Sequence, residues 1–175
     1  MVGGATPDAS GTQLLLSLRR MNHIRDLDVG SRIVVAEAGV ILESLHSAVL
    51  AKGLRFPLTL GGKGSATIGG LVSTNAGGTQ VLRHGTMRAL VTGVEAVLPD
   101  GSIFDGLAPL KKDNRGYDIR HLLCGAEGTL GVVTSASLQL VPATSARQTA
   151  WIGLASPDDA LLLLRRLDSA LGNAL

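Results

Sequence analysis

A glycine-rich segment, GGKGSATIGGLVSTNAGG at residues 61–78, constrains the fold of this 175-residue chain more than any other feature. Seven of its 18 residues are glycine, and most of the others have small side chains. Such a segment buries little apolar side-chain surface, so it contributes bare main chain to whatever it contacts. Any account of the protein must therefore say what this main chain lies against.

The rest of the chain can build a hydrophobic core. Hydrophobic residues make up 45% of it and charged residues 17%, as in globular rather than disordered proteins. The net charge of +2 comes from scattered basic residues, and only 2% of the residues are aromatic. Because nucleic-acid binders show clustered basic faces or stacking aromatics, we expect no nucleic-acid partner. The apolar runs are too short for a membrane helix.

The cysteine and histidine content gives weaker indications. The single cysteine, Cys124, excludes an internal disulfide framework and is consistent with a reducing compartment. No signal-peptide pattern follows Met1, so we expect a cytoplasmic protein. No two of the four histidines have metal-binding spacing, so no metal site is expected.

Hydrophobic periodicity predicts an α+β order, with antiparallel strands and helices between them. Strands are predicted at residues 13–18, 32–39, 131–142 and 149–155, and a hairpin at 90–106 turns at Pro99–Ser102. Helices are predicted within 40–53, from Asp118 to Gly125, and after the N-cap Ser156. A linker at 142–148 separates one domain from the start of a second.

Three interpretations of residues 61–78 compete. The glycines could serve tight turns and close backbone packing, with no ligand. The segment matches neither of the common phosphate-binding loops. The Walker pattern needs Ser or Thr after Gly62-Lys63, where this chain has Gly64, and the dinucleotide pattern GxGxxG needs glycine where this chain has Thr67. The third interpretation is a flavin dinucleotide bound by a different fold, because free amides among small hydroxyl and amide side chains suit an anion.

Two motifs favour the third interpretation. IGGLVSTNAGG at residues 68–78 and GAEGTLGVVT at 125–134 flank a PDG hairpin. In this order they resemble the FAD-linked oxidases of the vanillyl-alcohol oxidase/p-cresol methylhydroxylase (PCMH) superfamily. Within it, the resemblance is strongest to the group of D-2-hydroxyglutarate dehydrogenase, D-lactate dehydrogenase and the glycolate oxidase flavin subunit. It covers about residues 3 to 150.

The resemblance implies an architecture and a reaction. Residues 1–148 would be the second lobe of a PCMH-type FAD-binding domain whose first lobe lies upstream, and 149–175 would begin the substrate (cap) domain. The cofactor would be FAD, and the reaction the oxidation of a small D-2-hydroxy acid to the 2-oxo acid by hydride transfer to flavin N5. Alternatives are another alcohol or an aldonolactone as substrate, or a non-catalytic binding module.

The resemblance also implies where the groups for binding and catalysis lie. Catalytic residues would lie in the cap domain, so none is assigned here, and the chain alone would be inactive and could self-associate. His84 is expected not to bond covalently to flavin. The segment 111–118 is either a solvated turn or a flavin or domain contact. The implied FAD contacts are Gly3, Gly4, Pro57, Gly61, Ser65, Thr67, Ile68, Gly69, Gly70, Thr74, Asn75, Gly77, Gly78, Glu127, Gly128, Gly131 and Val132.

Overall fold

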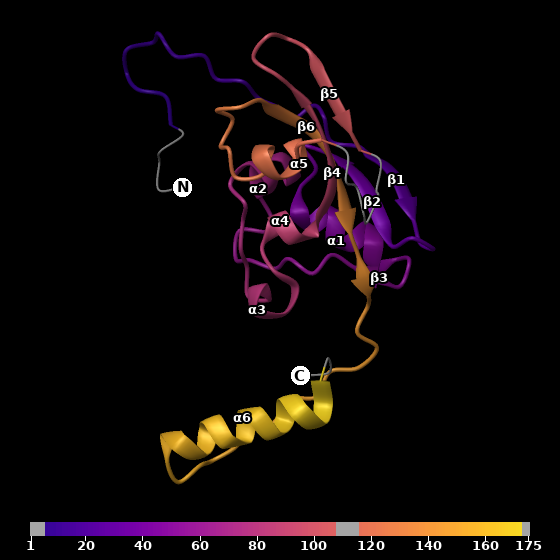
Figure 1. The fold of residues 1–175 in the computed structure, drawn as a ribbon, viewed down its shortest axis with the longest axis vertical. Coiled ribbons are helices and arrows are strands. Elements are labelled where there is room, and N and C mark those ends of the chain that lie inside the picture. Colours follow the sequence, from indigo (N-terminus) through magenta and orange to yellow (C-terminus); the bar gives the residue numbers. More distant parts are fainter. Residues whose placement is uncertain (1–5, 108–115, 173–175) are drawn as a thin grey trace. The chain divides into compact units, whose positions relative to one another are not determined.

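A computed structural model of the chain describes residues 6–107 and 116–172 (Figure 1). The predicted contacts Gly3 and Gly4 and most of the segment 111–118 lie outside these ranges. The chain divides into two compact units, residues 1–143 and 144–175. The glycine-rich segment and both family motifs belong to the first unit.

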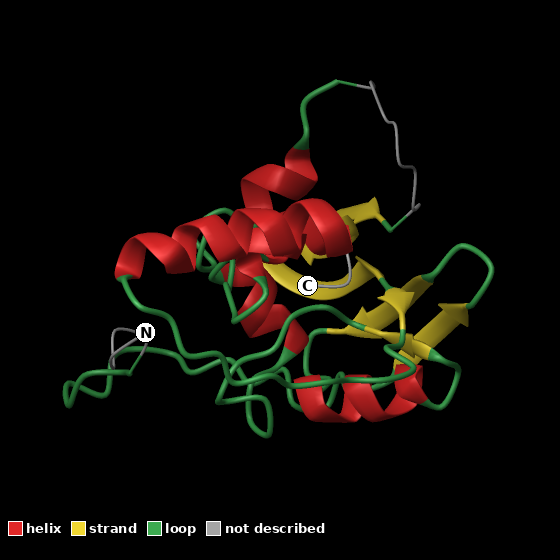
Figure 2. Ribbon diagram, turned by 90° about the horizontal axis from the view of Figure 1, so that it is seen from below, coloured by secondary structure: helices red, strands yellow, loops and turns green. Residues whose placement is uncertain are grey.

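The first unit is built on an antiparallel five-stranded sheet in the order β1-β2-β6-β4-β5. Figure 2 shows the strands in yellow, with helices in red beside them. The bounds are β1 Ile24–Asp28, β2 Ile33–Glu37, β4 Val91–Val97, β5 Ile103–Gly106 and β6 Val132–Gln139. A separate two-stranded sheet pairs β3 (Leu54–Arg55) with β7 (Val141–Pro142).

The described residues of this unit, 6–107 and 116–143, also form five helices, and most of them are short. They are α1 Leu42–Leu50, α2 Ile68–Ser73, α3 Val81–His84, α4 Met87–Leu90 and α5 Ile119–Leu123. Helices of four to six residues have little intrinsic stability, so tertiary contacts hold them in place. The geometry around the glycine-rich segment therefore depends on packing and on specific hydrogen bonds.

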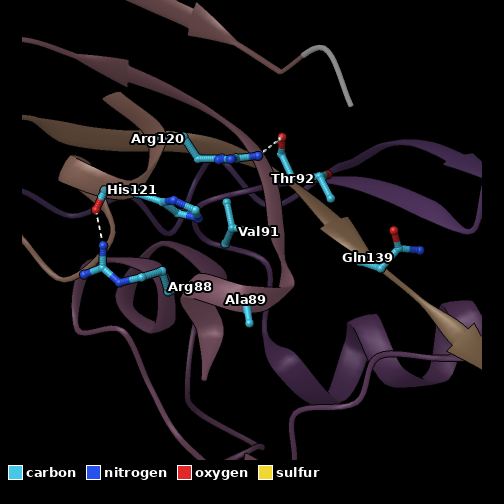
Figure 3. Close-up of a pocket in the computed structure, with 7 residues that line it drawn as sticks. All are labelled: Arg88, Ala89, Val91, Thr92, Arg120, His121 and Gln139. Atoms are coloured by element: carbon cyan, nitrogen blue, oxygen red, sulfur yellow. Dashed lines mark hydrogen bonds between the residues drawn. The ribbon is translucent and has the colours of Figure 1, made fainter. Parts of the chain in front are cut away.

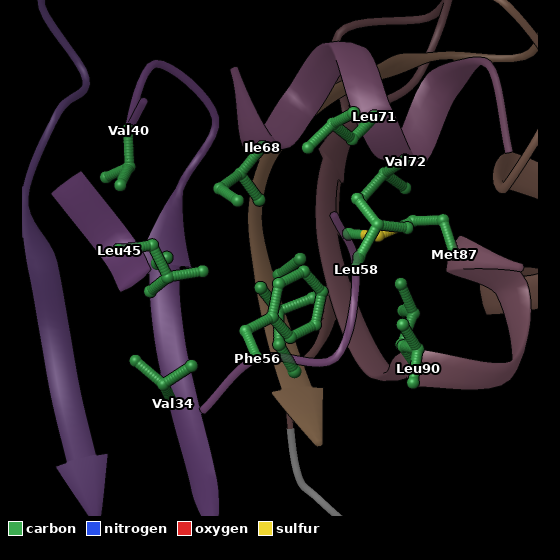
Figure 4. Close-up of a cluster of buried hydrophobic side chains, with 14 of the residues drawn as sticks. Val34, Val40, Leu45, Phe56, Leu58, Ile68, Leu71, Val72, Met87 and Leu90 are labelled. Carbon is green, nitrogen blue, oxygen red and sulfur yellow. The ribbon is translucent and has the colours of Figure 1, made fainter. Parts of the chain in front are cut away.

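The core lies between the sheet and these helices. Figure 4 shows Phe56 and Leu58 between Leu45 on one side and Met87 and Leu90 on the other. All five side chains are buried, at 4% exposure or less, and Ile68, Leu71 and Val72 of α2 join the same cluster. Each fully buried side chain of this size contributes about 1.5–3 kcal/mol. This cluster fixes α2, and with it the glycine-rich segment, against the sheet.

Most of the predicted elements are confirmed, and so is the α+β fold class. Strands β2 and β6, helices α1, α5 and α6, and the β4–β5 hairpin all fall within their predicted ranges. Gly53, Gly101 and Gly125 adopt positive φ angles of 72°, 84° and 89° at the predicted helix ends and hairpin turn.

Two predicted strands are wrong. Residues 13–18 form no strand, and Leu14, Leu15 and Leu16 are 93%, 72% and 61% exposed. Residues 149–155 also form none, and Trp151 is fully exposed. An apolar, β-prone segment becomes a strand only where another strand pairs with it, and neither segment has such a partner in the part of the chain described here.

The second unit consists mainly of α6, Pro157–Leu171. Ser156 caps the helix as predicted, since its Oγ accepts a hydrogen bond from the amide of Asp159 at 3.3 Å. Leu161, Leu162 and Leu164 each remain about half exposed. That this unit begins a cap domain stays a prediction. No helix in the described ranges is long and apolar enough to cross a bilayer.

A charged cluster spans the sheet face opposite the core. Register pairs Glu37 with Ser135 and Ser135 with Glu95, so these residues point away from the buried Ala36, Ala136 and Val94. From β1, Arg25 donates to Glu37 at 3.1 Å and to both carboxylate oxygens of Glu95 at 2.9 and 3.2 Å. The cluster therefore connects three different strands through one guanidinium.

Removal of this guanidinium should destabilise the fold in a pH-dependent way. At neutral pH, Arg25→Met should lower the free energy of unfolding by about 1–2 kcal/mol, because two partly buried carboxylates lose their hydrogen bonds to the guanidinium. Arg25 lowers the pKa of Glu95, so the stabilisation is present above the ordinary glutamate pKa and is lost as pH falls through the lowered one. Urea unfolding of both proteins at several pH values measures the difference.

The exposed ion pair between Lys63 and Glu43 (3.1 Å) provides the control. Glu43→Gln should change the unfolding free energy by less than about 0.5 kcal/mol. This account would be contradicted if Arg25→Met and Glu43→Gln changed the free energy of unfolding equally. It would also be contradicted if the change caused by Arg25→Met did not become smaller in acid.

Candidate functional site

The first turn of helix α1 holds the glycine-rich turn in place. The amide of Leu42 donates to the carbonyl of Ala66 at 2.9 Å, and the amide of Glu43 donates to the carbonyl of Lys63 at 3.1 Å. The first amides of a helix have no acceptor within the helix. Here, carbonyl groups of the glycine-rich turn accept hydrogen bonds from two such amides of α1. In exchange, α1 fixes the path of residues 63–66.

The main-chain amides of this segment fall into two groups. Ile68 donates to the carbonyl of Val40 at 2.9 Å and Gly69 to that of Ala38 at 2.8 Å, and both residues are buried. By contrast, the amides of Gly64, Thr67 and Gly70 donate to no group in the described part of the chain. Of the five residues predicted to wrap a pyrophosphate, Thr67 and Gly70 therefore carry free amides, whereas the amide of Ser65 donates to the carbonyl of Gly62 at 3.0 Å.

The glycines also divide by the space around them. A Cβ on Gly69 would lie 2.6 Å from Cβ of Ala38, and one on Gly78 would collide with the main chain of Thr59. These two positions are glycine because other parts of the chain pack there. A Cβ on Gly61 would meet nothing within 4 Å, and one on Gly64 only a glutamate oxygen at 3.5 Å. Internal packing does not require glycine at these two positions, as expected where a ligand approaches the backbone.

Hydrogen bonds join the two sequence motifs at the end of α2. The amide of Gly125 donates to the carbonyl of Val72 at 3.0 Å, and that of Glu127 to the carbonyl of Ser73 at 2.8 Å. Glu127 and Gly128 are exposed and adopt positive φ angles of 50° and 83°. The fold therefore makes residues 65–75 and 125–128, which are far apart in the chain, neighbours.

Asn75 is fixed at this junction. It has a φ of 47°, which asparagine tolerates better than most residues, and its Oδ1 accepts a hydrogen bond from the amide of Arg88 at 2.9 Å. Because this oxygen is engaged, the side-chain NH₂ is the group of Asn75 that remains to contact a ligand. The hydroxyl of Thr74 donates back to the carbonyl of Gly70 at 2.8 Å.

The other predicted contacts have varied surroundings. Pro57 and Gly131 are buried, and a Cβ on Gly131 would lie 3.0 Å from the carbonyl oxygen of Val97. Val132 is half-buried at the start of β6, whereas Gly77 is exposed. The structure therefore offers residues 61–67, Gly70 and residues 125–128 as an accessible main-chain surface and places Pro57 and Gly131 in the interior.

His84 has a protein partner. Its Nε2 lies 3.3 Å from Nη2 of Arg55, whose Nη1 donates to Gln80 at 2.7 Å. Partial burial and the nearby cations Arg55 and Arg83 lower the pKa of His84, which favours a neutral ring that accepts from Arg55. The expectation of non-covalent flavin binding stays a prediction.

A cavity of about 410 Å³ lies elsewhere, near helix α5 (Figure 3). None of the glycine-rich residues lines it, and its lining consists of Arg88, Ala89, Val91, Thr92, Arg120, His121 and Gln139. Nη1 of Arg120 donates a hydrogen bond to the carbonyl of Thr92 at 3.0 Å. Nε of Arg120 and the hydroxyl of Thr92 are buried and have no hydrogen-bond partner among the described residues. The cavity therefore lies apart from every residue predicted to contact FAD.

Comparison with known families identifies the domain. The FAD binding domain family matches residues 1–106, which is more than half of the chain. The chain belongs to this family. Its cofactor is therefore FAD, and the recognition made from the two motifs is confirmed.

Curated relatives agree with this assignment. The chain is 42% identical to bovine (Bos taurus) mitochondrial D-2-hydroxyglutarate dehydrogenase over its whole length, and 44% identical to the Arabidopsis thaliana enzyme over 87% of its length. It is 38% identical to a D-2-hydroxyglutarate–pyruvate transhydrogenase of Saccharomyces cerevisiae over its whole length. It covers 32%, 27% and 35% of these proteins, so it spans about a third of the length of its relatives.

A solved structure shows the same fold at lower identity. Alkyldihydroxyacetonephosphate synthase superposes on 73% of the chain with a TM-score of 0.64 and 23% identity, and the match covers 23% of the synthase. At this identity the likeness concerns the fold alone.

The predicted cytoplasmic location is wrong. The bovine and Arabidopsis relatives are both named as mitochondrial proteins. The prediction relied on the single thiol and on the lack of a signal-peptide pattern after Met1. One buried cysteine shows only that the chain has no internal disulfide, whatever the compartment.

The described residues fit FAD as the cofactor. The amides of Gly64, Thr67 and Gly70 have no partner in the described ranges, and Gly64 also has open space where a Cβ would be, so a diphosphate could approach the main chain there and accept hydrogen bonds. Gly64, Thr67 and Gly70 would hold the diphosphate, and the NH₂ group of Asn75 would donate to an oxygen of the flavin or its ribityl chain. No group of three or more metal-ligating side chains is present in the described ranges.

Substitution of two glycines should separate packing from ligand binding. Gly69→Ala should lower the free energy of unfolding by about 1–3 kcal/mol, because its methyl group would overlap Ala38 and α2 cannot move without breaking the Gly69–Ala38 hydrogen bond. Gly64→Val should leave stability within about 0.5 kcal/mol but weaken FAD retention in the full-length protein. Urea unfolding and flavin content measure the two effects, and equal destabilisation by both substitutions would contradict the division.

Proposed function

We propose that the chain is the FAD-binding part of a flavoenzyme that oxidises a small D-2-hydroxy acid to the 2-oxo acid. The observation that carries this proposal is the junction of α2 with the 125–128 loop, which joins both family motifs into one main-chain surface. The identity to D-2-hydroxyglutarate dehydrogenases at 42% and 44% supports the substrate class.

In this proposal the chain binds and orients the cofactor. Bound FAD supplies the capacity to accept a hydride at N5. The amides of Gly64, Thr67 and Gly70 hold the negative diphosphate, and Asn75 donates from its NH₂ group while Arg88 keeps its oxygen engaged. The groups that take the hydroxyl proton and bind the substrate carboxylate would lie in the part of the full-length protein that corresponds to the other two thirds of the relatives.

Two alternatives remain distinct from this proposal. The first is a related flavoenzyme with another alcohol or an aldonolactone as substrate. The similar fold of alkyldihydroxyacetonephosphate synthase is the reason to retain this alternative, since proteins of one fold can catalyse different reactions. The second is a binding module without redox chemistry.

Anaerobic titration of the full-length protein tests the proposal. The purified protein should show the visible absorbance bands of flavin, and D-2-hydroxyglutarate should bleach them as hydride reduces the flavin. The L enantiomer at the same concentration is the control and should leave the spectrum unchanged. A yellow protein bleached only by another alcohol or a lactone would support the first alternative, and a colourless full-length protein the second.

A further inference from the structure

We propose that Arg88 is a positioning residue for the FAD site. The main-chain amide of Arg88 holds one part of this site, and its guanidinium holds another. The amide fixes the side chain of Asn75, and the guanidinium binds the carbonyls that lead into the 125–128 loop. This inference rests on the proposed FAD site, since the positioned groups are the ones assigned to the cofactor.

The guanidinium replaces a helical hydrogen bond at the end of α5. In a continuing helix, the amide of Gly125 would donate to the carbonyl of His121, four residues earlier. Here the amide of Gly125 donates to the carbonyl of Val72 instead, and Nη1 of Arg88 donates to His121 O. Arg88 therefore donates to the carbonyl of His121, which lacks its helical donor because the amide of Gly125 bonds to α2 instead.

The second arm of the guanidinium extends this contact. Nη2 donates to the carbonyl of Cys124, the residue directly before Gly125. A cation is also favourable at the carboxyl end of a helix, where the final carbonyls lack helical partners. One side chain thus holds both carbonyls at the point where the chain leaves α5.

Asn75, Arg88 and Gly125 are in direct contact. A Cβ on Gly125 would lie 3.1 Å from Nη2 of Arg88 and 3.2 Å from Cβ of Asn75. The main-chain amide of Arg88 donates to Oδ1 of Asn75 at 2.9 Å on the same side. Arg88 is half-buried, so these hydrogen bonds are partly shielded from water.

Loss of the guanidinium has a defined structural consequence. The carbonyls of His121 and Cys124 would lose their charged donors, and the amide of Gly125 could return to His121 by extending α5. That return breaks the Gly125–Val72 hydrogen bond and separates the 125–128 loop from α2. We therefore expect loss of FAD affinity in addition to any loss of stability.

Arg120 on α5 provides a matched control. Its Nη1 donates to the carbonyl of Thr92 at 3.0 Å and its Nη2 to Asp118 at 3.0 Å. It therefore anchors the same helix through a main-chain carbonyl, as Arg88 does. No hydrogen bond connects Arg120 to Asn75 or Gly125.

The experiment compares Arg88→Met with Arg120→Met in the full-length flavoprotein. Arg88→Met should raise the FAD dissociation constant by about tenfold or more, the scale of one charged hydrogen bond. It should also change the visible circular dichroism of the flavin that remains bound. Arg120→Met should lower the melting temperature but keep the FAD dissociation constant within about threefold and the dichroism unchanged. Arg88→Lys, which can reach only one carbonyl at a time, should give an intermediate constant.

Each unexpected outcome overturns a definite statement. A wild-type dissociation constant for Arg88→Met, or an equal rise for Arg120→Met, would overturn the positioning role. If Arg88→Met does not fold, a wild-type constant and dichroism for Arg88→Lys would overturn it. A wild-type full-length protein that binds no FAD would instead refute the proposed function.

Discussion

The hydrogen bonds from Gly125 to Val72 and from Glu127 to Ser73 are the contacts on which the candidate site depends. Helix α2 has only six residues, and the loop that it meets has positive φ angles at three of four positions, so neither has much stability of its own. Together they bring two distant motifs into contact. The hydrophobic core beneath α2 and the Arg88 guanidinium beside α5 stabilise this junction.

Dense glycine in this chain has two physical causes. At Gly69 and Gly78 the backbone packs so closely on Ala38 and Thr59 that a Cβ would overlap them. At Gly61 and Gly64 a Cβ would have room, and the nearby free amides of Gly64, Thr67 and Gly70 suit an anionic ligand. The packing interpretation therefore holds at Gly69 and Gly78, and the ligand interpretation stays a prediction for the other part of the same segment.

Local patterns predicted the parts of the fold that local chemistry determines. Ser156, Asp118 and Gly125 delimit helices through capping, and Gly101 turns the hairpin, so these elements were predictable. The strand predicted at 13–18 failed because pairing, not composition, makes a strand. The role of Arg88 was also beyond sequence reasoning, because its partners His121 and Cys124 lie more than 30 residues away.

Site-resolved hydrogen exchange of the full-length protein, with and without FAD, tests the central claim most directly. The claim is that exposed main chain of the glycine-rich segment contacts the cofactor. FAD should slow exchange at the amides of Gly64, Thr67 and Gly70, which have no partner among residues 6–107 and 116–172. It should change Ile68 and Gly69 much less because they already donate to Val40 and Ala38. Unchanged exchange at Gly64, Thr67 and Gly70 on saturation with FAD would contradict the account.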